Sequence, residues 1–88
     1  MIISKTYPSS RFVRSYRKLP PRIRKLAQKR EKIFLSDPFA AGLNTHKLKG
    51  ELFGYWSYSV NYEYRIMFRF CGTDEVLYYD IGTHEIYK

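Results

Sequence analysis

The fold is decided by one stretch near the C-terminus, Tyr64-Arg-Ile-Met-Phe-Arg-Phe70, followed by Cys71-Gly-Thr-Asp74 and Val76-Leu-Tyr-Tyr-Asp-Ile81. In the first run, large apolar residues recur at every second position, the period of a half-buried strand. The second run alternates in the same way, and this predicts Leu77, Tyr79 and Ile81 on one face and Val76, Tyr78 and Asp80 on the other. The residues between the runs are turn formers, so the stretch predicts an antiparallel hairpin.

Two further strands are expected outside this hairpin. Tyr55–Val60 alternates large and small residues, and Ile2–Tyr7 is a short apolar run at the start of the chain. The loop 39–50 and the tail 83–88 show no periodicity, so neither is assigned a helix or strand.

Two helices are predicted over residues 9–36. Pro8-Ser9-Ser10 offers a serine N-cap, and Pro20-Pro21 both ends the first helix and opens the second. The second helix is expected to end near Ser36-Asp37-Pro38, and its apolar stripe comprises Ile23, Leu26, Ala27, Ile33 and Phe34. The pattern indicates a helical hairpin with one apolar seam and a basic exterior.

The order β-α-α-β-β-β predicts an α+β domain that spans residues 1–88 as a single unit. Both helices should pack on one face of a mostly antiparallel sheet. The other face should stay uncovered, and polar strand residues such as Arg65 and Asp80 are expected to point there.

Charge is concentrated in the first part of the chain, which carries a formal net charge of +8 overall. Residues 1–36 hold eleven Lys or Arg and one acid, Glu31, for a net +10, whereas residues 37–88 hold five basic and seven acidic residues, for −2. This asymmetry favours a polyanion or an acidic protein as partner. The residues expected to contact RNA are Arg22, Lys25, Lys29 and Lys32.

Several classes of protein are excluded by composition. No run approaches the ~20 apolar residues that span a bilayer, and the first residues lack the apolar core of a signal peptide. We therefore expect a soluble cytoplasmic protein with no membrane partner. The single cysteine, Cys71, excludes a disulfide framework. Neither a metal site nor a cofactor is expected, because no metal-ligand spacing and no glycine-rich phosphate loop occur.

The remaining chemistry-bearing residues lie at the ends of predicted elements, and they suit metal-free RNA cleavage. That reaction needs a base for the 2′-OH proton, an acid for the 5′-oxygen and fixed cations for the phosphorane. The candidates are His46, Lys47, Lys49, Arg65, His84 and Tyr87. Plainer roles stay open: a solvated histidine, an Arg65 paired with Asp80 or Glu63, and a Tyr87 that only packs.

Four segments together resemble the bacterial RelE/ParE toxin superfamily: His46-Lys-Leu-Lys-Gly50, Gly54-Tyr-Trp56, Tyr64-Arg-Ile-Met-Phe68, and Ile81-Gly-Thr-His84 with Ile86-Tyr87. The resemblance implies a toxin of a type II toxin–antitoxin pair, with a cognate antitoxin as partner. Its RelE-, YafQ- and YoeB-like members are ribosome-dependent endoribonucleases that cut mRNA, and its ParE-like members instead inhibit DNA gyrase without being enzymes.

Carried over position by position, the resemblance places His46, Lys47, Lys49, Arg65, His84 and Tyr87 in the catalytic group. His46 and Tyr87 favour the endoribonuclease branch, with the ribosome and mRNA as partners, and the gyrase-inhibiting branch is the alternative. One departure concerns the strand after Trp56, which often carries arginines in this family and has Ser57 and Ser59 here.

Overall fold

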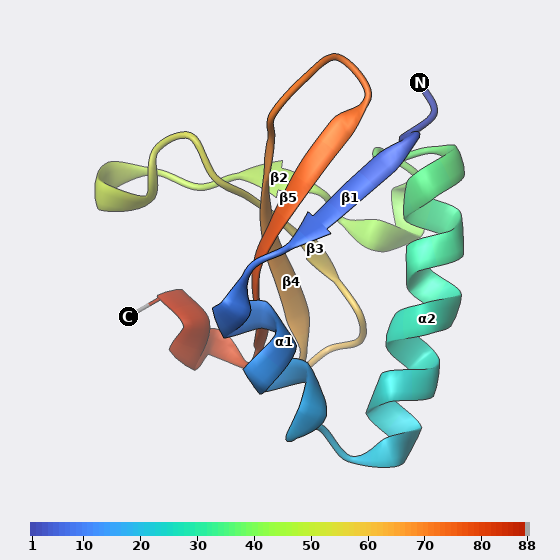
Figure 1. The fold of residues 1–88 in the computed structure, drawn as a ribbon, viewed down its shortest axis with the longest axis vertical. Helices are drawn as coiled ribbons and strands as arrows, with labels where there is room; N and C mark the ends of the chain where they lie inside the picture. The colour runs from blue at the N-terminus through green and yellow to red at the C-terminus, as the bar shows by residue number, and fades with distance from the viewer. Residues whose placement is uncertain (88) are drawn as a thin grey trace.

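The computed structural model describes residues 1–87, which form two helices and a five-stranded sheet (Figure 1). The helices are α1 (Ser10–Arg17) and α2 (Pro21–Ser36). The strands are β1 (Lys5–Pro8), β2 (His46–Lys47), β3 (Trp56–Ser59), β4 (Arg65–Phe70) and β5 (Glu75–Gly82). Three short 3₁₀ turns complete the described chain: η1 (Ala41–Leu43), η2 (Gly50–Leu52) and η3 (His84–Tyr87).

The sheet has the strand order β1-β5-β4-β3-β2. Only β1 and β5 pair in parallel, and the other three pairings are antiparallel, so the predicted α+β architecture is confirmed. Strand β2 is not predicted from the sequence, because two residues are too few to show a period. β2 lies within the expected loop 39–50 and forms one edge of the sheet.

Both helix starts follow from the predicted signals. The Ser9 side chain accepts a hydrogen bond from the Phe12 backbone N–H at 3.0 Å and caps α1, while Pro21 occupies the first position of α2. α2 ends at Ser36, before Pro38. Neither helix within residues 1–87 is long and apolar enough to cross a membrane.

The core lies between α2 and the sheet, and it is centred on Phe34. This ring stacks on Tyr58 of β3 at a centroid distance of 4.3 Å and meets Phe68 of β4 edge-on at 4.9 Å. Ile23, Ala27 and Phe34 are buried as expected from the stripe. Ile33, in contrast, is 41% exposed, so its assignment to the stripe was wrong. Its neighbour Phe34 faces the sheet, and consecutive residues on a helix point about 100° apart.

A bulge between β4 and β5 changes the predicted faces of β5. Met67 pairs with Asp80 while Phe68 pairs with Tyr78, so Tyr79 is an extra residue without a partner in the ladder. The alternation shifts at this point, and Ile81 joins Val76 and Tyr78 in the core. The prediction that Ile81 shares a face with Leu77 and Tyr79 was therefore wrong.

The bulge is held by the segment that leads into α1. Ser9 donates its backbone N–H to the Tyr78 carbonyl and its hydroxyl to the Tyr79 carbonyl, at 2.9 and 2.6 Å. The Asp80 carboxylate accepts a hydrogen bond from the Ser15 hydroxyl at 2.6 Å and is 5% exposed. Asp80 pairs with Met67 and so lies on the same face as Arg65, as expected, but it is buried against α1, so the expectation that it is uncovered was wrong.

Two buried tyrosines add a polar contact to the core. The hydroxyls of Tyr58 and Tyr78 lie 3.2 Å apart. Burial raises the pKa of both phenols well above the ordinary value near 10, and the charge of Glu31 contributes in the same direction. Both groups therefore stay protonated in the folded protein and serve as structural groups.

Replacing Phe34 with alanine should destabilise the fold by about 3–5 kcal/mol, because a buried ring is removed and a cavity remains. The matched control is Ile33→Ala at the neighbouring, partly exposed position, which should cost much less. Urea unfolding followed by circular dichroism measures both variants. Equal decreases in stability would contradict the assignment of Phe34 to the centre of the core.

The raised phenol pKa values predict a decrease in stability at high pH. Above about pH 10 the unfolded chain releases these protons while the folded chain keeps them, so the free energy of unfolding falls as pH rises. Each tyrosine contributes a slope of about 1.4 kcal/mol per pH unit. This slope is measured by urea unfolding between pH 9 and pH 11, about one unit on either side of the ordinary phenol pKa.

Tyr78→Phe should remove the contribution of one tyrosine to the slope of the unfolding free energy against pH. The control Tyr62→Phe, at a 94% exposed position, should leave the slope unchanged. The same slope in the parent protein and in Tyr78→Phe would show that this phenol ionises normally.

Candidate functional site

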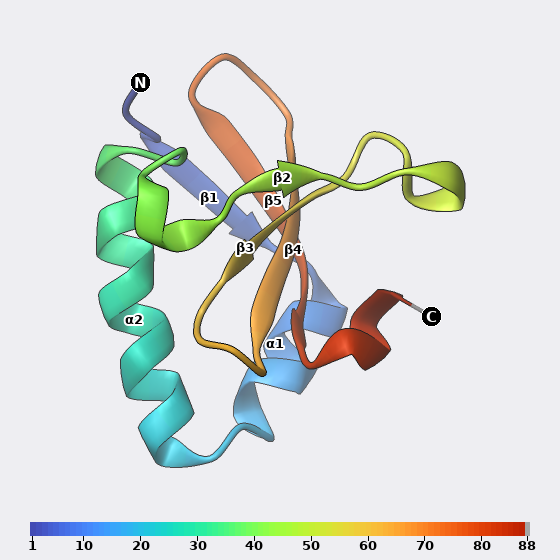
Figure 2. The same ribbon diagram turned by 180° about the vertical axis from the view of Figure 1, so that it is seen from behind.

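The face of the sheet turned away from α2 carries the candidate site. Tyr58 and Ile66 are paired across β3 and β4 and are buried on the α2 side. Since consecutive strand residues point to opposite faces, Ser57 and Arg65 point away from α2. The C-terminal turn η3 lies on this same side of the sheet, opposite α2 (Figures 1 and 2).

The turn η3 delivers Tyr87 to the sheet. The Tyr87 hydroxyl donates a hydrogen bond to the Ser57 hydroxyl at 2.7 Å. Ile86 is buried and packs on Gly82, where an added Cβ would come within 2.8 Å of the Ile86 side chain. Gly82 therefore permits the close approach that sets the position of η3. His84, on the same turn, is exposed, and its ring meets that of Tyr87 edge-on at 6.2 Å.

Arg65 supplies a positioned cation beside this pair. It is the first residue of β4 and is half-buried between Ser59 of β3 and Gly82 of β5. One terminal nitrogen, Nη2, donates to the Tyr62 carbonyl at 3.4 Å. Its Nε is buried and has no hydrogen-bond partner among the described residues. The buried Nε is shielded from an incoming anion, whereas the terminal nitrogens of a guanidinium carry further N–H donors for an anionic oxygen.

The predicted alternative partners of Arg65 are engaged elsewhere or exposed. The Asp80 carboxylate bonds to Ser15, and its other oxygen lies 3.9 Å from a guanidinium nitrogen of Arg11. Glu63 is exposed on the turn between β3 and β4. In the part of the chain that the structure describes, no ion pair involves Arg65.

Three other predicted site residues, His46, Lys47 and Lys49, lie outside the group that Ser57, Arg65 and Tyr87 form. His46 pairs with Ser57 across β2 and β3, which places it on the same side as Ser57, at the exposed edge, and its Nδ1 lies 2.9 Å from the Asn44 carbonyl. Lys47 pairs with Trp56, and its ammonium lies 5.4 Å from the centre of that ring, toward the opposite face. Lys49 is exposed in the loop before η2.

The sequence predicts no role for Ser57, whose hydroxyl accepts the hydrogen bond from Tyr87 in the structure. In the sequence, the one notable feature of Ser57 is that it stands on a strand where the resembling family often has arginines. The alternation of Tyr55–Val60 was sufficient to place Ser57 on the face opposite Tyr58, but nothing in the sequence indicated that a tail residue would reach it.

The residues expected to contact RNA form a separate surface. Arg22, Lys25, Lys29 and Lys32 are all exposed along α2. α2 covers the opposite side of the sheet from η3 (Figure 1). The basic surface on α2 is therefore distinct from the face that carries Ser57, Arg65 and Tyr87.

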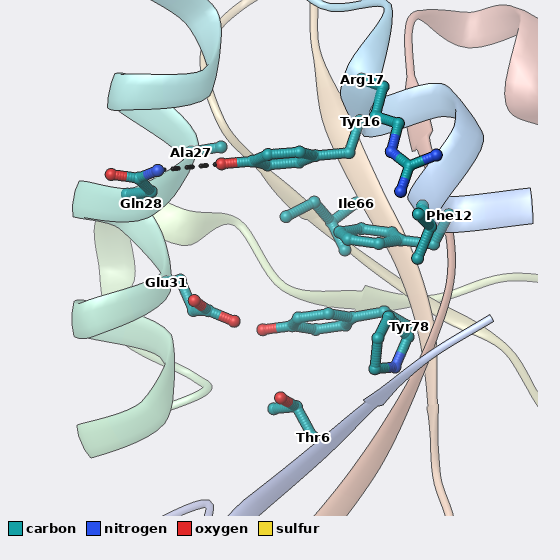
Figure 3. Close-up of a pocket in the computed structure, with 11 residues that line it drawn as sticks. Thr6, Phe12, Tyr16, Arg17, Ala27, Gln28, Glu31, Ile66 and Tyr78 are labelled. Carbon is teal, nitrogen blue, oxygen red and sulfur yellow. Dashed lines mark hydrogen bonds between the residues drawn. The ribbon is translucent and has the colours of Figure 1, made fainter. Parts of the chain in front are cut away.

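A cavity of about 310 Å³ lies between α1, α2 and the sheet (Figure 3). Its walls include Phe12 and Ile66, the Glu31 carboxylate points toward the Tyr78 hydroxyl, and Gln28 donates to the Tyr16 hydroxyl at 3.0 Å. The buried phenol of Tyr78 remains protonated, so it is a poor acid–base group near neutral pH. This mainly apolar cavity is therefore not a candidate catalytic site.

Comparison with solved structures identifies the architecture, whereas no protein-family model and no curated protein matches the sequence. A YoeB/ParE toxin from Agrobacterium tumefaciens aligns with a TM-score of 0.77 at 21% identity, over 91% of this chain and 98% of its own. The RelBE2 toxin–antitoxin complex from Mycobacterium tuberculosis gives 0.78 at 21% identity, over 96% and 94%. The YoeB–YefM complex from Staphylococcus aureus gives 0.72 at 19% identity, over 90% and 94%. The chain therefore has the fold of the RelE/ParE toxin superfamily.

Proposed function

We propose that this protein is the toxin of a type II toxin–antitoxin system and acts as a ribosome-dependent mRNA endonuclease. The observation that carries the proposal is the position of the Tyr87 hydroxyl, at Ser57, on the face of the sheet that also holds the half-buried Arg65. A surface that only binds gyrase has no need of a proton-transfer group next to a fixed cation. The sequence motifs and the fold shared with YoeB and RelE toxins support the assignment.

In the proposed reaction the RNA 2′-oxygen attacks the adjacent phosphorus and gives its proton to a base, while the 5′-oxygen leaves and takes a proton from an acid. Arg65 donates to the phosphorane oxygens, where charge accumulates in the transition state. Tyr87 and His84 are the acid–base pair, and His46 approaches from the β2 edge. The roles of Lys47 and Lys49 are to bind the flanking backbone, in keeping with their exposed positions.

The basic surface of α2 serves binding in this proposal. Arg22, Lys25, Lys29 and Lys32 would contact ribosomal RNA, and an acidic antitoxin would compete for the same charges. Several structures with this fold are toxin–antitoxin complexes, including RelBE2 and YoeB–YefM, which supports an antitoxin partner here. The site of action would be the cytoplasm, where ribosomes translate mRNA.

Tyr87→Phe should lower mRNA cleavage by about 10²–10⁴-fold, because it removes the proton-transfer group and keeps the ring against His84. The matched control is Ser57→Ala, which removes only the hydrogen-bond acceptor and should have a much smaller effect. Primer extension on a reporter mRNA after induction measures both. Cleavage at the parent rate by a folded Tyr87→Phe variant would contradict the proposal. Intact mRNA with trapped gyrase–DNA complexes would instead select the ParE-like alternative.

Reversing two charges on α2, Lys25→Glu together with Lys29→Glu, should weaken ribosome association while the fold is kept, because both side chains are exposed. The affinity should also become less dependent on salt, with a slope shallower by about one unit for each phosphate that is no longer neutralised. Ribosome sedimentation at several salt concentrations measures this, and co-purification with the product of the neighbouring open reading frame measures antitoxin binding. Unchanged sedimentation and unchanged co-purification would show that α2 contacts neither the ribosome nor the antitoxin.

A further inference from the structure

The side of the sheet that carries Ser57 and Tyr87 also holds a pair of tyrosine rings. Tyr55 directly precedes β3, and Tyr79 is the extra residue of the β5 bulge. Their ring centres lie 5.2 Å apart at an angle of 55°. Tyr55 lies two residues from Ser57 along the chain, so the two share a face. The pair therefore adjoins the proposed reaction centre.

These two tyrosines differ from most others in the molecule. Tyr58 pairs with Tyr78, Tyr16 accepts from Gln28, and Tyr87 donates to Ser57. Within residues 1–87, the hydroxyls of Tyr55 and Tyr79 have no hydrogen-bond partner, and both residues are half-buried, with Arg11 of α1 beside the Tyr79 ring. Their aromatic surface and their hydroxyls are thus available to a ligand.

A cation completes the arrangement. The guanidinium of Arg11, on α1, lies 5.3 Å from the centre of the Tyr79 ring and within 3.9 Å of the Asp80 carboxylate, and the Arg11 side chain is 51% exposed. Asp80 orients this guanidinium, and the exposed half of the side chain can reach a phosphate. Aromatic faces combined with a planar cation are the usual means of holding unstacked bases.

We propose that Tyr55 and Tyr79, with Arg11, form a stacking site for one base of single-stranded RNA next to the scissile position. The proposal rests on the proposed function and names how the substrate is held. Beside the neutral Ser57 and Ser59 of β3, this face then offers aromatic rings from Tyr55, just before β3, and from Tyr79 of β5. Tyr55 and Tyr79 act as positioning residues, and the reacting atoms lie at Arg65 and Tyr87.

The test measures binding of a short 2′-O-methyl RNA, which cannot be cleaved, by fluorescence anisotropy at moderate salt. Tyr79→Leu and Tyr55→Leu keep apolar bulk but remove the aromatic face, and each should weaken binding by about 5- to 150-fold. The control Tyr62→Leu alters a 94% exposed ring and should bind as the parent does. Circular dichroism establishes that each variant folds.

A second set of oligonucleotides, each with one base removed, makes the inference specific. At one position, removing the base should weaken binding to the parent but have little further effect on Tyr79→Leu, because the stacking interaction is already absent. Equal base-removal effects in parent and variant at every position would overturn the stacking site. A parent that binds none of the oligonucleotides would overturn it as well.

Cleavage assays separate this inference from the proposed function. If the parent and Tyr79→Leu cut mRNA equally and bind the oligonucleotide equally, the stacking site is wrong and the endonuclease stands. If the parent fails to cut mRNA on ribosomes but shows the position-specific weakening with Tyr79→Leu, the endonuclease is wrong and the stacking site stands.

Discussion

The contact of Phe34 with Tyr58 and Phe68 is the interaction on which the rest of the structure depends. It holds the one long helix on one face of the sheet, at ring distances of 4.3 and 4.9 Å. On the other face, Ser57 and Met67 are buried and Arg65 is half-buried, and the C-terminal turn η3 reaches this face through the hydrogen bond from Tyr87 to Ser57.

The bulge at Tyr79 is the second constraint, and it connects the first helix to the same face. Without the extra residue, Asp80 would point into the core, where an unpaired carboxylate is costly. With it, Ile81 enters the core and Asp80 meets Ser15 and Arg11 of α1. One irregularity in the ladder thus satisfies a buried charge, fixes α1 beside β5 and places a guanidinium over Tyr79.

The two sides of the sheet use the same residue type for different purposes. On the α2 side, Tyr58 and Tyr78 are buried, and burial raises their pKa so that they remain neutral packing groups. On the other side, Tyr87 and the Tyr55–Tyr79 pair are only partly buried and meet polar or charged neighbours. This division accounts for much of the tyrosine content of a chain that holds nine of them. The basic residues of α2 and the Tyr87 hydroxyl therefore lie on separate surfaces, which the proposed function uses for binding and for chemistry.

The sequence by itself determined the element types, the helix caps at Ser9 and Pro21 and the side of the sheet on which Arg65 lies, since these follow from local periods and local hydrogen bonds. It also carried the motif order that led to the correct fold. Only the tertiary structure decided that Tyr87 reaches Ser57, that Asp80 is bound by α1 and that Lys47 turns toward Trp56. Each of these depends on contacts between segments distant in the chain, or on a bulge and a two-residue strand that leave no periodic signal. A pattern of side chains specifies which face a residue takes, whereas packing decides which residues meet there.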